Sequence, residues 1–127
     1  MEVVCLDTDI LIEYWRTKQH AKSRTRLYKF ASTYQFAVSA ITAYELLRGD
    51  NSTEDTFWKG FFAQVRLLDF DLECAIIAGE IYRYLKTSGT LIGVEDILIA
   101  ATVLKHGMML ASNNTRHFAR IKGLLII

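Results

Sequence analysis

Two adjacent acids, Glu95 and Asp96, stand near the start of the segment GVEDILIAATVLKHG (93–107), which is otherwise almost wholly apolar. The spacing of the apolar residues predicts a helix that begins at about Asp96 and ends at Gly107. Acids in a first helical turn meet the positive end of the helix dipole, which stabilises them by roughly 0.3–1 kcal/mol each. Either the pair serves the helix in this way, or a buried helix carries a carboxylate to a site that needs negative charge.

Other acids follow segments that are typical of buried strands. Asp7 and Asp9 come directly after the apolar run VVCL (3–6), and we expect Glu45 in the first helical turn after a second strand, QFAVS (35–39), and its short loop. Ligands gather at the carboxyl ends of parallel strands, so these acids are expected at one edge of the sheet. Each also has a structural alternative: the two aspartates as turn or cap residues, and Glu45 as a solvated helix position.

A further strand, MMLAS (108–112), is followed by polar residues that fall at the same edge. These are Ser112, Asn113 and Asn114, although asparagines are also ordinary turn residues. The pattern alone does not place Asp96, because a helix that leads into a strand is expected to start far from the carboxyl edge.

Carboxylates that converge on one point would repel each other without a cation, and an all-oxygen site favours Mg²⁺ or Mn²⁺ over zinc. Such an ion can activate a water molecule and neutralise a phosphodiester during cleavage. The histidines His20, His106 and His117 show neither ligand spacing nor a paired nucleophile, and we expect them at the surface or in loops, although His117 is close to Asn114. The sequence contains no Gly-rich phosphate loop and no G-x-S-x-G turn.

The elements that must position these residues alternate between short apolar strands and helices. Strands are predicted at 3–6, 35–39, 66–70, 108–112 and 124–127, helices at 10–15, 23–34, 42–49, 53–65, 72–87 and 96–107, and a helical turn at 114–121. Thr8 or Asp9 is expected to cap the first helix. The alternation predicts a single α/β domain over residues 1–127, with a parallel sheet flanked by helices on both faces.

Composition sets further limits. A chain of 127 residues with 51% hydrophobic residues can bury one core, and its net charge of +1 means that nucleic acid would have to bind a local basic patch. Cys5 and Cys74 lie in apolar segments and are expected to be buried free thiols. Because acids occur as early as Glu2 and no apolar run approaches about 20 residues, we expect a soluble, cytoplasmic protein without a leader.

Four segments, taken in order, resemble one known family. VVCLDTDILIEY, SAITAYELLRG, GVEDILIAATVLKHG and LASNNTRHFARIKGL cover nearly the whole chain. Together they are similar to the PIN-domain ribonucleases, in particular the VapC-type toxins of bacterial and archaeal toxin–antitoxin pairs. The tetrapeptide LDTD alone would be weak evidence, and it is the order and spacing of all four that indicate the family.

The resemblance implies a role for each acid. Asp7, Glu45 and Asp96 match the metal-binding acids, so the helix would bring Asp96 to a Mg²⁺ or Mn²⁺ site and these three, with Asn114, would be the catalytic residues. Glu95 is then an extra acid that we interpret as a helix cap. The residues expected to support the acids by hydrogen bonding are Thr8, Asp9 and Ser112.

The chain also departs from the family pattern at two positions. Asn114 stands where many relatives keep a fourth acid, which implies that a second metal binds weakly or only with substrate. His117 stands where an acid often precedes the phenylalanine, and the sequence offers no account of this change.

The function implied by the resemblance is a metal-dependent endoribonuclease, the toxin of a type II toxin–antitoxin system. Its implied partners are the RNA substrate, a small VapB-like antitoxin and a second copy of the chain in a homodimer. A fold that has kept RNA binding and lost chemistry is the alternative, which the intact set of three acids disfavours. A phosphatase or other hydrolase with a covalent aspartate would also suit LDTD, but no matching lysine and loop set can be identified.

Two surface features bear on these partners. The aromatic pairs Phe57-Trp58 and Phe61-Phe62 occupy more than one stripe of their predicted helix, and Tyr14 and Trp15 add to them. They are expected to form an interface, with core packing as the alternative. The candidates for phosphate contacts are Arg48, Arg116 and Arg120, each of which could equally be a solvated surface residue.

Overall fold

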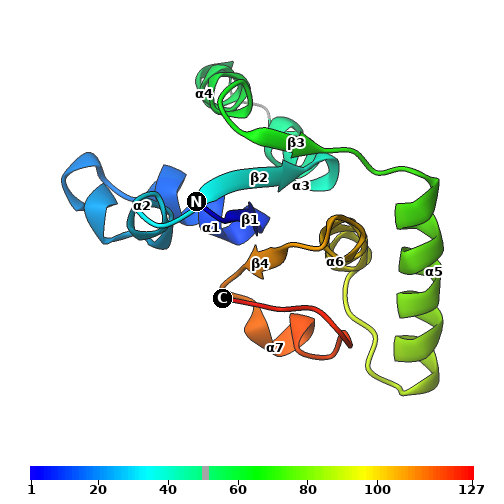
Figure 1. Ribbon diagram of the computed structural model, residues 1–127. Coiled ribbons are helices and arrows are strands. Elements are labelled where there is room, and N and C mark those ends of the chain that lie inside the picture. Colours follow the sequence, from blue (N-terminus) through cyan, green and yellow to red (C-terminus); the bar gives the residue numbers. More distant parts are fainter. Residues whose placement is uncertain (50–51) are drawn as a thin grey trace.

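The computed structural model describes residues 1–49 and 52–127. Its elements in chain order are β1 (Val3–Leu6), α1 (Thr8–Arg16), η1 (Gln19–Arg24), α2 (Arg26–Phe30), β2 (Gln35–Ser39), α3 (Ala40–Leu47), α4 (Ser52–Phe62), β3 (Arg66–Leu68), α5 (Leu72–Thr87), α6 (Val94–His106), β4 (Met109–Ala111) and α7 (Thr115–Phe118). Strands and helices alternate as predicted (Figure 1).

The four strands form one parallel sheet in the order β3-β2-β1-β4. β1 lies inside the sheet, with Cys5 beside Ala37 of β2 and Leu110 of β4. Because every pair is parallel, the carboxyl ends of all four strands share one edge, which is where a parallel sheet places its ligands.

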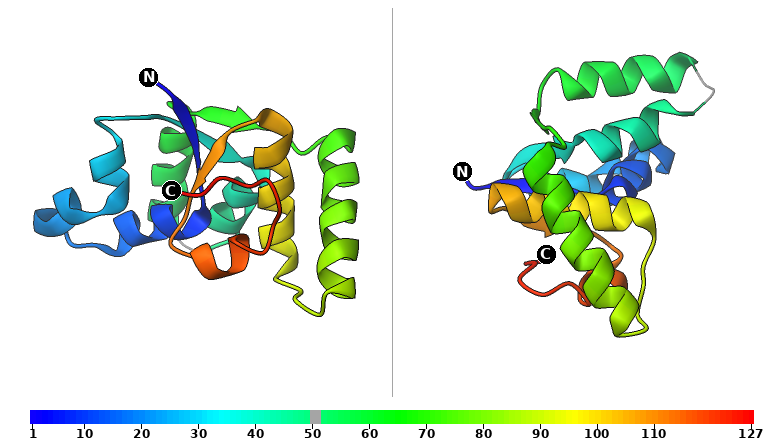
Figure 2. Two further views of the ribbon diagram at one scale, coloured as in Figure 1. Left: turned by 60° about the horizontal axis from the view of Figure 1, so that its bottom comes forward. Right: turned by 90° about the vertical axis from the view of Figure 1, so that its right-hand side faces the viewer.

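Successive side chains of β1 pack into two separate hydrophobic cores. Cys5 packs with residues of α5, α6 and α7, whereas Val4 and Leu6 pack with residues of α1, α2, α3 and α4, among them the fully buried Trp58. α5 and α6 lie side by side on their face of the sheet (Figure 2). The predicted fold class, a parallel sheet flanked by helices on both faces, is confirmed.

Two predicted elements differ from the structure. The helix expected at 23–34 is broken, because Thr25 adopts an extended backbone and caps α2 after the short 3-10 helix η1. The strand expected at 124–127 is reduced to one parallel bridge between Ile126 and Leu110. Leu125 and Ile127 form backbone hydrogen bonds with Leu110 and Ser112, because the chain returns to β4 only in its last residues, after a left-handed turn at Gly123.

The expectation for the cysteines is confirmed, since Cys5 and Cys74 are both buried and free. Over residues 1–49 and 52–127, no helix combines the length and the apolar character needed to cross a bilayer.

Candidate functional site

Asp7 lies at the carboxyl end of β1 and is only 4% exposed. Its Oδ1 accepts a hydrogen bond from the backbone N–H of Thr8 at 2.9 Å, so Asp7 caps α1, and the expectation that Thr8 or Asp9 would do so was wrong. Its Oδ2 accepts from the Ser112 hydroxyl at 2.7 Å. Pairing of β1 with β4 explains this contact, because it sets Leu6 beside Ala111 and brings the next residue of each strand together.

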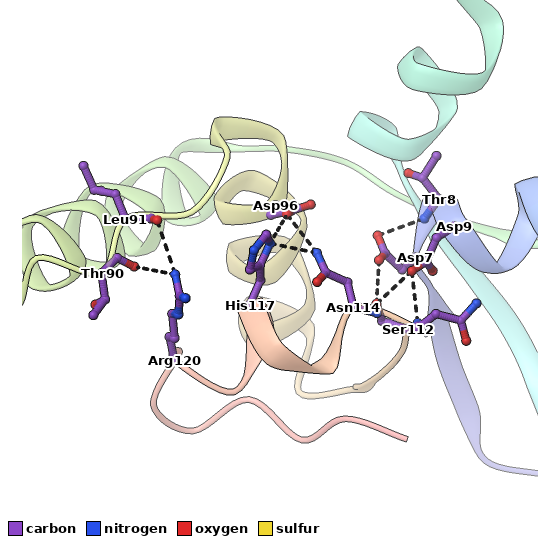
Figure 3. Close-up of polar contacts among 11 residues, drawn as sticks. Asp7, Thr8, Asp9, Thr90, Leu91, Asp96, Ser112, Asn114, His117 and Arg120 are labelled. Atoms are coloured by element: carbon purple, nitrogen blue, oxygen red, sulfur yellow. Dashed lines mark hydrogen bonds and ion pairs between the residues drawn. The ribbon is translucent and has the colours of Figure 1, made fainter.

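Asp9 lies one residue into α1 and faces the same loop (Figure 3). Its Oδ2 accepts from the backbone N–H of Asn113 at 3.0 Å and from Ser112 Oγ at 3.5 Å. Its Oδ1 is buried and has no hydrogen-bond partner among the residues that the structure describes. Buried carboxylate oxygens are normally paired with a donor or a cation, so this atom indicates a place where a cation would be stabilised.

Glu45 reaches the site from α3. Its Oε1 accepts from Thr8 Oγ1 at 2.6 Å, which confirms the expected hydrogen bond. It sits in the second turn rather than the first, because α3 begins at Ala40 directly after β2, without the expected loop.

Asp96 reaches the site from the first turn of α6, where its Oδ2 lies 3.4 Å from Asn114 Nδ2 and 3.7 Å from His117 Nδ1. The expectation that a helix leading into a strand starts far from the carboxyl edge was wrong. α6 ends at His106, close to the edge of the sheet at which β4 begins. Its 13 residues therefore extend back to the other edge, where the strands have their carboxyl ends. This edge is where β4 ends and Asn114 lies.

Among the described residues, His117 beside Asp96 is the one base in ion-pair contact with these acids. Burial, followed by the negative charge of Asp9, raises the pKa of Asp7 from its ordinary value of 3.8 to about 7. Burial also raises the pKa of Asp9 and of Asp96, and the charge of Glu45 adds to the rise at Asp96 while His117 opposes it. Within residues 1–49 and 52–127, no lysine or arginine forms an ion pair with any of the four carboxylates.

A second network, which the sequence did not reveal, holds the loop after β4. Arg26 Nη1 donates to the carbonyl of Ser112 at 2.8 Å and to Asn113 Oδ1 at 2.7 Å. Glu13 accepts from Asn113 Nδ2 at 3.2 Å and from the backbone N–H of Arg26 at 2.8 Å. The sequence predicted only that Arg26 belongs to a basic helix. Its partners lie 86 and 87 positions away, and no local pattern predicts such contacts.

The donor set fits a hard divalent cation. Carboxylate oxygens dominate it, and Mg²⁺ in proteins is usually held by one or two carboxylates while it keeps several waters. Among the described residues, no three His, Cys, Asp or Glu side chains are close enough to enclose an ion by themselves. An ion at this edge would therefore have one or two carboxylate ligands and otherwise bind water or amide oxygen.

Comparison with known proteins agrees with this arrangement. The sequence model of the PIN domain matches residues 4–124. The chain belongs to the PIN domain family. The similarity seen in the four sequence motifs is thereby confirmed, and it extends to the VapC group within the family.

Individual relatives show how far the similarity reaches. The chain is 32% identical to the tRNA(fMet)-specific endonuclease VapC of Salmonella typhimurium, over 95% of this chain and 93% of that protein. It is 33% identical to ribonuclease VapC2 of Haemophilus influenzae, over 94% and 92%. Among solved structures, a DNA-bound VapBC from Salmonella typhimurium superposes with a TM-score of 0.79 at 28% identity, covering all of this chain and 98% of that one.

Proposed function

We propose that this PIN domain protein is a divalent-metal-dependent endoribonuclease and the toxin of a toxin–antitoxin pair. The observation that carries the proposal is the buried Asp7 carboxylate, which shares one sheet edge with Asp96 and Glu45 and has no lysine or arginine partner among the described residues. Relatives that align over nearly the whole chain are named as an endonuclease and a ribonuclease, which supports cleavage of RNA.

Asp7, Asp96 and Glu45 are the residues that would hold Mg²⁺ or Mn²⁺, one or two of them as direct ligands and the others through bound water. A cation bound there would activate water and neutralise the phosphodiester. The remaining side chains orient the carboxylates: Ser112 and the N–H of Thr8 fix the two oxygens of Asp7, and Thr8 Oγ1 fixes Glu45. Asn114 belongs to the same machinery, because its amide contacts Asp96 and its backbone N–H donates to Ser112 Oγ.

RNA would bind the rim of this edge through its phosphates. Arg116 is exposed in α7, next to the site in sequence, and Arg48 lies with its guanidinium over the ring of Tyr44. Arg120 already forms hydrogen bonds within the protein, since its Nη1 donates to the carbonyls of Thr90 and Leu91. Each phosphate neutralised on a single strand contributes a slope of roughly −0.7 to log affinity against log salt, so cleavage at subsaturating RNA should fall steeply with salt.

The antitoxin would occupy an apolar surface formed by α1, α2 and α4. Trp58 and Phe62 belong to the core, but Phe57 and Phe61 are only partly buried. They line a cavity of about 270 Å³ together with Tyr14, Leu27, Tyr28, Ala31 and Phe36. Solved relatives in VapBC form contain both proteins of such a pair, and we expect a helical antitoxin segment here, with a basic side chain among the acids.

A homodimer remains a prediction. Leu72 and Ile76 are exposed one turn apart on α5, and exposed apolar patches often mark interfaces. Light scattering at tens of micromolar protein would test it, and a clean mass of 14.5 kDa would show a monomer.

The decisive experiment is cleavage of RNA by the purified protein, with the new ends located by sequencing. tRNA(fMet) is the first substrate to try, because a relative is named for it. Activity should require Mg²⁺ or Mn²⁺ and vanish with EDTA, and Asp7→Asn should abolish it while Glu80→Gln, which removes one exposed carboxylate on α5, should not. Binding of RNA without cleavage in either metal would instead favour the non-catalytic alternative.

A further inference from the structure

His117 points toward Asp96 rather than away from it. Its Nδ1 lies 3.7 Å from Asp96 Oδ2 and 3.0 Å from the amide nitrogen of Asn114 (Figure 3). Its side chain is 42% exposed, so the ring is also open to solvent or to a ligand. The sequence alone predicted a surface or loop histidine, and only the short helix α7 brings the ring to α6.

The three side chains form a triangle of the size that one ion requires. Its edges are 3.4 Å from Asn114 to Asp96, 3.0 Å from Asn114 to His117 and 3.7 Å from Asp96 to His117. Neighbouring ligands of an octahedral ion with bonds of about 2.1 Å are about 3.0 Å apart. Small side-chain shifts would therefore bring all three into a common coordination sphere.

The chemistry of the donors is compatible with this geometry. The Asn114 amide donates toward His117 Nδ1, so that nitrogen presents a lone pair to the cluster when the ring is neutral. A half-turn of the same amide replaces its NH₂ by Oδ1, which is a metal ligand in its own right. The cluster then consists of a carboxylate oxygen, an amide oxygen and an imidazole nitrogen.

We propose that His117 is a nitrogen ligand of the divalent ion, beside Asp96 and Asn114, and that it makes the site prefer a first-row transition ion over Mg²⁺. Imidazole binds first-row transition ions well, whereas Mg²⁺ prefers oxygen. The inference rests on the proposed function in one respect, because both place a divalent ion at the carboxyl edge of the sheet. It gives a role to a histidine for which the sequence by itself offers no account.

The test uses the full chain with Co²⁺ and Mg²⁺ as probes, and compares His117→Gln with His20→Gln, which changes an exposed histidine of η1. By calorimetry, His117→Gln should weaken Co²⁺ binding about tenfold or more and change Mg²⁺ affinity by less than about threefold, because only the nitrogen ligand is lost. By proton NMR, the Co²⁺-loaded wild type and His20→Gln should each show a strongly shifted, exchangeable imidazole resonance that His117→Gln lacks.

A third variant keeps the test informative if His117→Gln fails to fold. His117→Glu replaces nitrogen by oxygen, and it should bind Mg²⁺ more tightly than the wild type while losing the shifted resonance. Absence of that resonance from the wild type, or equal Co²⁺ affinity in His117→Gln, would overturn the inference. Mg²⁺-dependent RNA cleavage would in that case leave the proposed function intact, whereas a wild type that binds neither ion would remove both.

Discussion

Asp7 and Asp71 have the same local role and opposite electrostatics. Each is the N-cap of a helix, Asp7 for α1 and Asp71 for α5, and each accepts a hydrogen bond from a backbone N–H of that helix. Asp71 is exposed, and its pKa is held well below the ordinary value by the Cys74 N–H and by Lys105, whose Nζ lies 3.0 Å away. Asp7 is buried beside other acids, and its pKa is raised to about 7.

The difference shows that the capping role does not decide what an aspartate does. Lys105 and Asp71 form an ordinary ion pair between α6 and α5, which is typical of a residue that serves stability. Around Asp7 the partners are a hydroxyl, one backbone N–H and further carboxylates, so the accumulated negative charge destabilises the metal-free protein. An acid whose charge is stabilised only by an added cation is expected at a functional site.

The largest effect expected is on catalysis. Asp7→Asn, Glu45→Gln and Asp96→Asn should each lower the rate of RNA cleavage by at least about a hundredfold, because loss of even an outer partner of a metal ligand typically costs 10–100-fold. Asp71→Asn should leave the rate within about twofold of wild type. The rates of all variants would be measured on one RNA by gel assay. Near wild-type cleavage by Asp96→Asn would contradict the assignment of the site.

Asp7→Asn should affect stability in the opposite direction. An acid with a raised pKa in the folded state binds its proton more tightly there, so the free energy of unfolding falls as pH rises from about 4 through about 7. Asp7→Asn removes the contribution of Asp7 to this fall and leaves those of Asp9 and Asp96. In EDTA it should be more stable than wild type at pH 8, by a few kcal/mol at most, with the difference vanishing below pH 4.

Urea unfolding at several pH values would measure this difference. Saturating Mg²⁺ should stabilise the wild type at pH 8 and leave Asp7→Asn nearly unchanged, because the variant has lost a ligand. An Asp7→Asn protein that is less stable than wild type at pH 8 in EDTA would contradict the picture of uncompensated charge.

An intermediate effect is expected at the residue that orients the acids. Ser112 contacts both Asp7 and Asp9, and Ser112→Ala should lower the cleavage rate by roughly 10–100-fold while the fold is kept. Ser32→Ala, which removes an exposed hydroxyl on the surface, is the matched control. Equal rates in the two variants would mean that Asp7 keeps its position without this hydrogen bond.

The smallest effect concerns the paired aspartate. Asp71→Ala should lower the melting temperature by a few degrees, because it removes both a helix cap and an ion pair. Lys105→Met should have a smaller effect, since the cap remains. Differential scanning calorimetry at low and high salt would separate the two contributions, and a melting temperature unaffected by Asp71→Ala would show that this aspartate is not a stabilising cap.

Much of this protein follows from its sequence alone. Apolar runs of four or five residues specify β1 and β2, and the helix predicted at 72–87 has the bounds of α5, because hydrophobic period and local caps are short-range properties. Four motifs in order identify the family, and the three acids stand out through their position after strands or at the start of a helix.

Tertiary structure decided the rest, because the deciding contacts join segments far apart in the chain. The direction of α6 brings Asp96 to the carboxyl edge, and the pairing of β1 with β4 brings Ser112 to Asp7 across 105 positions. The same folding turns His117 from an apparent surface histidine into a neighbour of Asp96. Local sequence determines which groups can do chemistry, whereas the packing of the sheet and its helices determines which of them meet.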